Sequence, residues 1–271
     1  MIIDIHTHFY PDNIAKFIVA KIKQEVGINC YGNGTIASLK EYMQKDGIEI
    51  SFNAPVATKP EQVTSINRKM VEINNREKSV KCFGAMHPDF NRTGDIEKEI
   101  DFLVKNKIRL IKLHPEYQNF YPDDGKMDLI YELCIKNDIA ILFHSGYDFA
   151  FDEYNVHSTP KRFLNLLKKF PELKIILAHL GGYRMWDMVY KLLVGKNIYF
   201  DTAFINEISD ASFKSIVYEH GTDKILFGSD FPWERQNSIK EKIDRCIDNE
   251  KDRNKIFYEN AIKLLKIRDI L

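Results

Sequence analysis

The run IIDIHTH occupies residues 2–8, where apolar, mostly β-branched residues lead to two histidines, His6 and His8. Similar short apolar runs recur along the chain, each followed by a longer stretch whose apolar residues repeat at helical spacing. Continuous apolar runs of this kind are typical of parallel strands buried on both faces. The further runs span residues 48–55, 80–87, 108–115, 139–146, 173–181, 197–203 and 224–232.

This alternation of strand and helix over 271 residues predicts an α/β fold, a (β/α)8 TIM barrel. We expect one domain over residues 1–271, because no linker interrupts the alternation. The alternative is an open doubly wound sheet, but no GxGxxG motif follows the first run. Two connections, near residues 10–45 and 145–160, are unusually long. Because loops that follow strands lie at the catalytic face of a barrel, we expect these two to cover the site.

The composition is that of an ordinary globular protein, with 44% hydrophobic and 29% charged residues. The formal net charge is zero and no long basic stretch occurs, which argues against nucleic acid as a partner. We expect neither a signal peptide nor a membrane segment, and hence a soluble, cytoplasmic protein. The expected partner is a small-molecule substrate, and a homo-oligomer is compatible with the sequence.

Most histidines of the chain end a predicted strand, where a barrel would gather them at one rim. These residues are His6, His8, His87, His114, His144 and His179, and Asp201 and Asp230 end the last two predicted strands. Strand alternation predicts that His6 and His8 share the inward face with Asp4. It likewise places His179 on one face with Ile175 and Leu177. Imidazoles with a carboxylate are the ligand set that zinc and other divalent first-row metals prefer, and catalytic sites leave a position for water.

The motifs HTH (6–8), AHLGG (178–182) and GSDFPW (228–233), with a histidine closing the fifth run, resemble those of the amidohydrolase superfamily. The sequence is most similar to the amidohydrolase-2 branch. That branch contains hydrolases and metal-dependent decarboxylases such as the aminocarboxymuconate semialdehyde enzyme. The resemblance covers nearly the whole chain and implies a metal-dependent enzyme.

The resemblance implies four metal ligands: His6, His8, His144 and Asp230. It implies that His179 is either a ligand of a second metal or a base that orients the substrate. Lys112 in IKLHP (111–115) is similar to the lysine that is carboxylated and bridges two metals in dihydroorotase-like members. A substrate carboxylate or a buried acid are the alternative partners of this lysine. We expect one or two zinc ions, although manganese or iron suits the same ligands.

We expect a hydrolase that uses metal-activated water on a small amide, cyclic amide, ester or lactone. The predicted catalytic residues are Asp230, which would take the proton of the water, and His179, which would polarise the carbonyl. One alternative is a metal-dependent, non-oxidative decarboxylase or hydratase of an aromatic or dienoic acid; another is a non-catalytic metal-binding barrel. The predicted substrate-binding residues are His114, Tyr147, Arg184 and Trp233.

Overall fold

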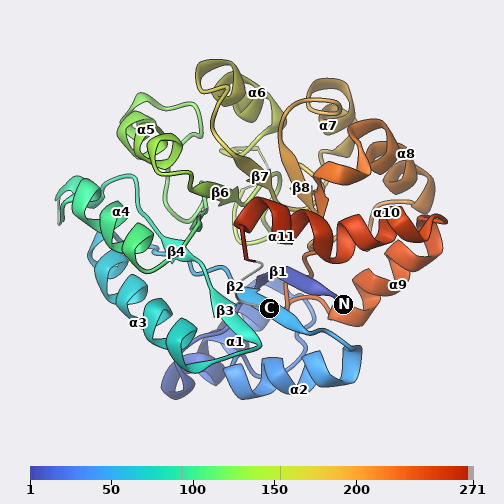
Figure 1. Cartoon of the computed structure of the whole chain (residues 1–271), viewed down its shortest axis with the longest axis horizontal. Helices are drawn as coiled ribbons and strands as arrows, with labels where there is room; N and C mark the ends of the chain where they lie inside the picture. Colours follow the sequence, from blue (N-terminus) through green and yellow to red (C-terminus); the bar gives the residue numbers. More distant parts are fainter. Residues whose placement is uncertain (93, 153, 268–271) are drawn as a thin grey trace.

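The computed structural model describes residues 1–271 except 93, 153 and 268–271. All of these exceptions fall within the predicted domain, and residue 153 falls within the predicted loop 145–160. Those parts of the two expectations therefore lie outside the described residues. In the rest of the chain, short strands form the centre and helices surround them (Figure 1).

Each predicted apolar run contains a parallel strand, and one run contains two. The strands are β1 (Ile3–Thr7), β2 (Ile50–Asn53), β3 (Val80–Cys82), β4 (Gly84–Ala85), β5 (Leu110–Leu113), β6 (Ala140–Phe143), β7 (Ile175–Leu177), β8 (Tyr199–Asp201) and β9 (Ile225–Leu226). The run 80–87 divides at Phe83, because β3 pairs with β2 whereas β4 pairs with β5. The ring of Phe83 stacks on Phe52 inside the barrel, with 4.7 Å between the centroids.

Backbone hydrogen bonds close the strands into a barrel. Strands β1 to β3 form one sheet and β4 to β9 form the other. At one junction the N–H of Phe83 donates to the carbonyl of Asn53, with a distance of 3.0 Å. At the other, the N–H of Ile5 donates to the carbonyl of Phe227 at 2.9 Å, and a parallel bridge joins Thr7 to Phe231. The predicted (β/α)8 barrel is confirmed.

Helices connect successive strands and mostly lie outside the barrel (Figure 1). They are α1 (Asp12–Val26), α2 (Ile36–Asp46), α3 (Val63–Arg76), α4 (Ile96–Lys105), α5 (Asp128–Lys136), α6 (Pro160–Lys169), α7 (Trp186–Leu192), α8 (Asp210–His220), α9 (Gln236–Cys246), α10 (Glu250–Asn254) and α11 (Asn260–Leu265). Shorter helical turns are η1 (Pro60–Gln62), η2 (Phe90–Arg92), η3 (Gly125–Met127), η4 (Thr222–Lys224) and η5 (Lys255–Glu259). Among the described helices, none has the length and apolar character needed to cross a membrane.

Local sequence explains where several helices begin. The Thr35 side chain accepts a hydrogen bond from the N–H of Ser38 at the start of α2, and Asp95 caps α4 in the same way. Pro160 occupies the first position of α6, where a missing N–H costs no helical hydrogen bond. The long connection 10–45 consists of α1, a loop over residues 27–35 and most of α2.

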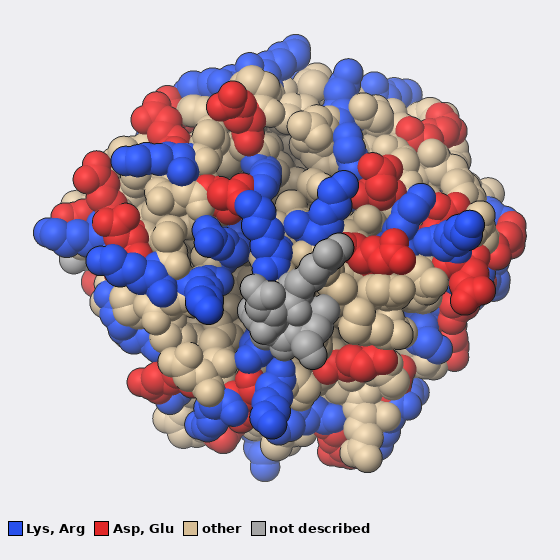
Figure 2. Space-filling model, viewed as in Figure 1, with Lys and Arg blue, Asp and Glu red and all other residues tan. Residues whose placement is uncertain are grey.

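Two apolar layers hold the barrel together. The interior cluster fills the barrel and includes Ile3, Ile5, Ile50, Phe52, Ala54, Phe83, Leu110, Ala140, Leu142, Ile176, Ala178 and Leu226. Helix α11 crosses the front of the barrel in Figure 1 and adds Leu264 and Leu265 to this cluster, so it covers the end at which the strands begin. Acidic and basic side chains are interspersed over this face (Figure 2).

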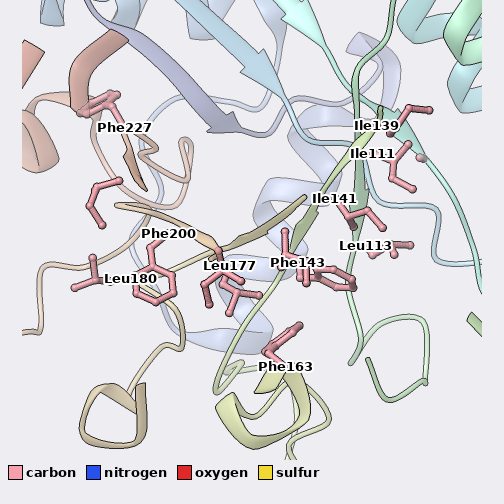
Figure 3. Packing of buried hydrophobic residues seen from close by; sticks show 14 of the residues in the cluster. Ile111, Leu113, Ile139, Ile141, Phe143, Phe163, Leu177, Leu180, Phe200 and Phe227 are labelled. Atoms are coloured by element: carbon pink, nitrogen blue, oxygen red, sulfur yellow. The ribbon is translucent and has the colours of Figure 1, made fainter. Parts of the chain in front are cut away.

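The second layer lies between the strands and the surrounding helices. Figure 3 shows Ile141 and Phe143 of β6 on the same side as Phe163 of α6. The rings of Phe143 and Phe163 meet edge to face, with 5.3 Å between their centroids. Burial of a large apolar side chain contributes about 1.5–3 kcal/mol, so this layer anchors each helix to its strand. Polar residues occupy the opposite end of the barrel, where the strands end.

The inward face of β1 differs from simple alternation. Ile5 belongs to the interior cluster, whereas Asp4 accepts a hydrogen bond from Nε2 of Gln236 in α9 at 2.7 Å. The pairing of β1 with β2 is irregular after Asp4, as expected for a β-bulge. A bulge adds one residue and reverses the alternation, which brings His6 to the interior side. The prediction that Asp4 shares a face with His6 is therefore wrong.

A similar correction applies to β7. Ile176 and Ala178 belong to the interior cluster, whereas Leu177 packs in the outer layer. Simple alternation would therefore point His179 outward. Instead, His179 and Leu180 have φ values of 59° and 55°, in the left-handed region that ordinary residues rarely adopt. This turn of the backbone at the strand end redirects the imidazole towards the site.

Candidate metal centre

His6 is fixed at the mouth of the barrel by a buried carboxylate. Its Nδ1 lies 2.7 Å from Oδ2 of Asp201, at the end of β8, and both side chains are almost completely buried. The Nδ1–H of His6 donates to this carboxylate, so Nε2 carries the free lone pair. A carboxylate behind an imidazole in this way is the usual support of a metal-ligating histidine.

His6, His8 and Asp230 form one group of potential metal ligands, whose donor atoms all lie within 4.8 Å of one another. Oδ1 of Asp230 is 3.5 Å from Nε2 of His6 and 3.0 Å from Nε2 of His8. Two donors bound to one ion at about 2.1 Å in tetrahedral geometry are about 3.4 Å apart. This donor set and its spacing fit a divalent first-row metal ion.

The second group of potential ligands consists of His114, His144 and Asp148, again within 4.8 Å. The two imidazoles stack with 4.2 Å between centroids and 9° between planes. Oδ2 of Asp148 lies 3.4 Å from Nε2 of His114 and 3.9 Å from Nε2 of His144. The structure thus places His144 with these two residues, whereas the resemblance implies that it joins His6 and His8.

His179 lies between the two groups. Its Nδ1 is 2.9 Å from the carbonyl of Ala203, and its Nε2 is 3.1 Å from Nδ1 of His144. Its ring centroid is 5.7 Å from that of His6. Oδ1 of Asp201 accepts the backbone N–H of His179 at 2.9 Å, so the same carboxylate positions both histidines.

Burial and neighbouring charges decide the charge state of several of these residues. Burial, aided by Lys112, lowers the pKa of His6 to about 4, and burial holds the pKa values of His114 and His144 well below 6.5. These imidazoles are therefore neutral at pH 7, as metal ligands must be. For Asp230, burial opposes ionisation, but His6 and His8 outweigh it and hold its pKa well below 3.8.

Lys112 is buried beside the first group. Its Nζ lies 3.0 Å from Nε2 of His6 and donates to the lone pair there. Burial lowers the pKa of Lys112 to about 8, against the opposing charges of Asp230 and Asp201. The side chain is 1% exposed, so the amine is available only to groups within the site.

The other predicted substrate-binding residues lie farther along the loops. Arg184 is engaged by Glu207 in a bidentate ion pair, with Nε–Oε2 and Nη2–Oε1 distances of 2.7 and 2.8 Å. Cζ of the Arg184 guanidinium lies 5.8 Å from the centroid of the Tyr147 ring. Trp233 lines a cavity of about 310 Å³ together with Phe149 and others.

The remaining histidines have local partners. Nδ1 of His87 accepts the N–H of Asp89 at 3.1 Å, and Nδ1 of His157 is 3.2 Å from the carbonyl of Pro115. Nε2 of His220, in α8, lies 2.9 Å from the carbonyl of Ile198. These contacts lie in loops or helices, so the three histidines are outside the two groups of potential metal ligands.

Sequence reasoning missed two acidic residues at the site. Asp148 follows His144 by four residues within the long loop 145–160, and Glu116 follows His114 by two. Oε1 of Glu116 accepts hydrogen bonds from Ser158, while its Oε2 lies 3.8 Å from Nδ1 of His114. A carboxylate shortly after a strand-end histidine is the only sequence signal, and it is weak because acidic residues are frequent in loops.

Comparison with known proteins places this chain in a family. The amidohydrolase family model matches residues 3–267. Over 142 residues the chain is 30% identical to gamma-resorcylate decarboxylase of Polaromonas sp. (strain JS666 / ATCC BAA-500), a match that covers 45% of this chain and 43% of that relative.

Two solved structures show the same fold. Dihydroxybenzoic acid decarboxylase from Polaromonas sp. JS666, with bound manganese and 2-nitroresorcinol, has a TM-score of 0.74 at 19% identity, covering 100% of this chain and 98% of that one. The D314N mutant of 5-carboxyvanillate decarboxylase from Novosphingobium aromaticivorans, also with manganese, has a TM-score of 0.74 at 14% identity, covering 98% and 97%. With the family match over nearly its whole length, this chain belongs to the amidohydrolase family.

Proposed function

We propose that this protein is a metal-dependent decarboxylase that removes carbon dioxide from a hydroxylated aromatic carboxylic acid without an oxidant. The observation that carries the proposal is the metal-type group of His6, His8 and Asp230, in which Asp201 fixes the His6 tautomer. The similarity to gamma-resorcylate decarboxylase supports the choice of reaction.

The expectation of a hydrolase is wrong on this comparison. The relative that matches at 30% identity is a decarboxylase, and the two fold relatives described above are decarboxylases of aromatic acids. The motifs that predicted a metal site are shared by hydrolases and decarboxylases of the family. They therefore identified the metal chemistry and left the bond to be broken undetermined.

His6, His8 and Asp230 would hold the divalent ion. When bound, such an ion supplies positive charge that binds and orients an anionic substrate. Manganese is the ion in both fold relatives, and the same nitrogen and oxygen donors suit zinc. We infer that manganese supports the reaction in this chain, with zinc as the ion to compare against it.

His179 would move the proton. Its Nδ1–H is held by the Ala203 carbonyl, which leaves Nε2 as the atom that exchanges protons. Once protonated there, His179 delivers the proton to the ring carbon that bears the carboxylate. The bond between this carbon and the carboxyl group then breaks, its electron pair stays with the ring, and carbon dioxide leaves.

Aromatic side chains beside His179 suit an aromatic substrate. Tyr183 lies 6.0 Å from the His179 ring, and Phe204 lies 5.5 Å from Tyr183, measured between centroids. Phe204 and Phe149 also line the cavity that includes Trp233. Such rings stabilise a flat ligand by stacking or edge contacts, about 0.5–1.5 kcal/mol each.

The test is carbon dioxide release from gamma-resorcylate, other dihydroxybenzoates and 5-carboxyvanillate by the manganese-loaded protein. We expect release from at least one of these acids and no hydrolysis of lactones or cyclic amides. His179→Gln should lower kcat about 100-fold or more, as expected for loss of a general acid. Asp223→Asn, an exposed carboxylate just before β9, is the control. Hydrolysis of a lactone or cyclic amide without decarboxylation would overturn the proposal.

A further inference from the structure

We propose that Asp148 determines which substrates the protein accepts, because its Oδ2 accepts a hydrogen bond from a hydroxyl group on the substrate ring. The proposal rests on the proposed function and names the ring substituent that the site selects. Asp148 lies in the loop that follows β6, four residues after His144. The way in which this loop is held decides where the carboxylate lies.

Main-chain hydrogen bonds fix the start of this loop against the segment that follows β7. The N–H of Tyr183 donates to the carbonyl of Ser145 at 2.9 Å, and the N–H of Tyr147 donates to the carbonyl of Tyr183 at 3.0 Å. A Cβ at Gly146 would lie 2.2 Å from the backbone nitrogen of Tyr183, so only glycine allows this close approach. Asp148 therefore follows directly on a fixed stretch of backbone.

A buried carboxylate fixes the end of the same loop. Oε1 of Glu116 accepts hydrogen bonds from the N–H groups of His157 and Ser158 and from the Ser158 hydroxyl. The carbonyl of Ser158 in turn accepts the N–H of Gly146 at 2.9 Å, which joins the two ends of the loop. A side chain on a loop that is held at both ends has a defined position, as a residue that selects a substrate needs.

The two carboxylate oxygens of Asp148 have different surroundings. Oδ1 accepts the N–H of Ala150 at 2.8 Å, which forms a local turn. Oδ2 faces the strand-end imidazoles, 3.4 Å from Nε2 of His114 and 3.9 Å from Nε2 of His144. The Asp148 side chain is 16% exposed, so a small molecule can reach it. An ionised carboxylate oxygen accepts two hydrogen bonds, so Oδ2 retains a lone pair for a ligand even when His114 donates to it.

The tautomer of His114 suits this arrangement. The N–H of Tyr117 donates to Nδ1 of His114 at 3.4 Å, which leaves the proton on Nε2, the nitrogen that faces Oδ2 of Asp148. Oε2 of Glu116, 3.8 Å from the same Nδ1, is beyond hydrogen-bond distance. The His114 ring also stacks on the His144 ring, with 4.2 Å between centroids. His114 therefore directs a proton at Asp148 and helps to hold its carboxylate in place.

Asp148 also lies at a suitable place relative to the proton donor. Nε2 of His179 is 3.1 Å from Nδ1 of His144, and Oδ2 of Asp148 is 3.9 Å from Nε2 of the same ring. His179 and Asp148 are thus separated by a single imidazole. A substrate ring that lies beside His144 can therefore meet His179 at the carbon that loses the carboxylate and Asp148 at a hydroxyl group.

The charge of Asp148 makes the selection strong. Among the residues that the structure describes, its ion-pair partners are His114 and His144, and neither a lysine nor an arginine pairs with it. The negative oxygen therefore attracts a hydroxyl donor and repels an ether oxygen, which can only accept. A hydrogen bond to a charged group changes affinity about 10–100-fold.

The experiment compares the affinities of the dihydroxybenzoates with those of their monomethyl ethers by calorimetric titration. It uses the manganese-loaded His179→Gln protein, which should bind these acids without converting them. We expect at least one dihydroxybenzoate to bind at least about 10-fold more tightly than its ether. Adding Asp148→Asn should abolish or reverse this preference. The asparagine oxygen can still accept the N–H of Ala150, so its NH2 group, a donor, takes the place of Oδ2.

Asp152→Asn, in the same His179→Gln protein, is the matched control. Oδ1 of Asp152 likewise accepts the N–H of the residue two positions later, Tyr154, at 2.9 Å, but Asp152 is exposed. This change should leave the preference for the hydroxyl group intact. Manganese content, measured by mass spectrometry, should be the same in all variants, and thermal unfolding followed by circular dichroism checks that each is folded.

Equal binding of the acids and their ethers, or binding of neither, would overturn the proposal. A preference for the hydroxyl group that survives Asp148→Asn would overturn it too, because the selection would then come from another residue or from size. Loss of manganese in Asp148→Asn would instead make Asp148 a ligand and would also overturn it. Carbon dioxide release by the wild type is measured separately, so failure of the proposed reaction stays distinguishable from failure of this binding preference.

Discussion

Nδ1 of His6 and Oδ2 of Asp201 lie 2.7 Å apart in the interior of the barrel mouth. The two residues belong to β1 and β8, and the segment that follows β9 approaches them at Gly228. A Cβ at Gly228 would lie 3.0 Å from Cβ of His6 and 3.3 Å from that of Asp201. The missing side chain therefore lets the carboxylate reach the imidazole and direct its other nitrogen towards Asp230.

Asp201→Asn should weaken metal binding without removing a ligand. The amide can still accept from Nδ1 of His6, but it lacks the negative charge that supports a ligating imidazole. We expect the affinity for Mn²⁺ to fall about 10–100-fold, as for other residues that support ligands. Calorimetric titration measures this, with Asp223→Asn as the control. An unchanged affinity, with the fold intact, would show that His6 is not a ligand.

Asp230→Asn should abolish carbon dioxide release by removing the ion that His6 and His8 share with it. Excess Mn²⁺ in the assay should restore only a small part of the activity, because a neutral amide is a poor ligand for a hard cation. Initial rates over a range of Mn²⁺ concentrations measure the loss. The wild-type protein treated with a chelator should lose activity too, but should recover it fully when Mn²⁺ is returned. Wild-type rates in the variant without added metal would exclude this ion from the reaction.

Lys112 should carry a free amine rather than a carbamate. Its Nζ lies 3.0 Å from Nε2 of His6. Its pKa of about 8 keeps most of the amine protonated at pH 7, and the protonated form does not react with carbon dioxide. Native mass spectrometry at neutral pH should give the unmodified mass. An added mass of one carbon dioxide, absent in Lys112→Met, would contradict this.

His220 should make stability depend on pH independently of the metal site. Its ring stacks on Phe200 with 4.0 Å between centroids, and Nε2 lies 2.9 Å from the Ile198 carbonyl. Burial lowers its pKa from 6.5 to about 4, so between these values the unfolded chain binds more protons than the folded one. The contribution of the neutral His220 imidazole to the free energy of unfolding is fully present above pH 6.5. It is lost as the pH falls towards 4, by at most about 3 kcal/mol.

The measurement compares His220→Gln with the wild type by urea unfolding at pH 7, 5.5 and 4. The difference in free energy of unfolding should shrink as the pH falls, because the glutamine does not titrate. The comparison is needed because burial also raises the pKa of Asp4 and of Glu116 to about 7, which changes stability in the opposite direction over the same range. A difference that stays constant with pH would contradict the buried neutral imidazole.

The local sequence was sufficient to predict the barrel and the position of its polar rim. Apolar runs buried on both faces specify strands wherever they occur, and the polar residue that ends each run marks where burial stops. His6, His114 and Asp230 could be placed at one rim for that reason. Periodicity did not predict which residues of β1 and β7 face the barrel interior. A bulge in β1 and two left-handed residues after β7 shift the alternation there.

By itself, then, the sequence determined which strand-end residues could serve a metal, because residue type and strand position are local properties, whereas Asp148 in a loop was missed. Only the tertiary structure decided how they are grouped: His8 with Asp230, and His144 with Asp148. That grouping depends on barrel closure, on hydrogen bonds such as that of His179 with Ala203, and on the path of a loop. These contacts join residues far apart in the chain, and their distances and tautomers exist only once the barrel is closed.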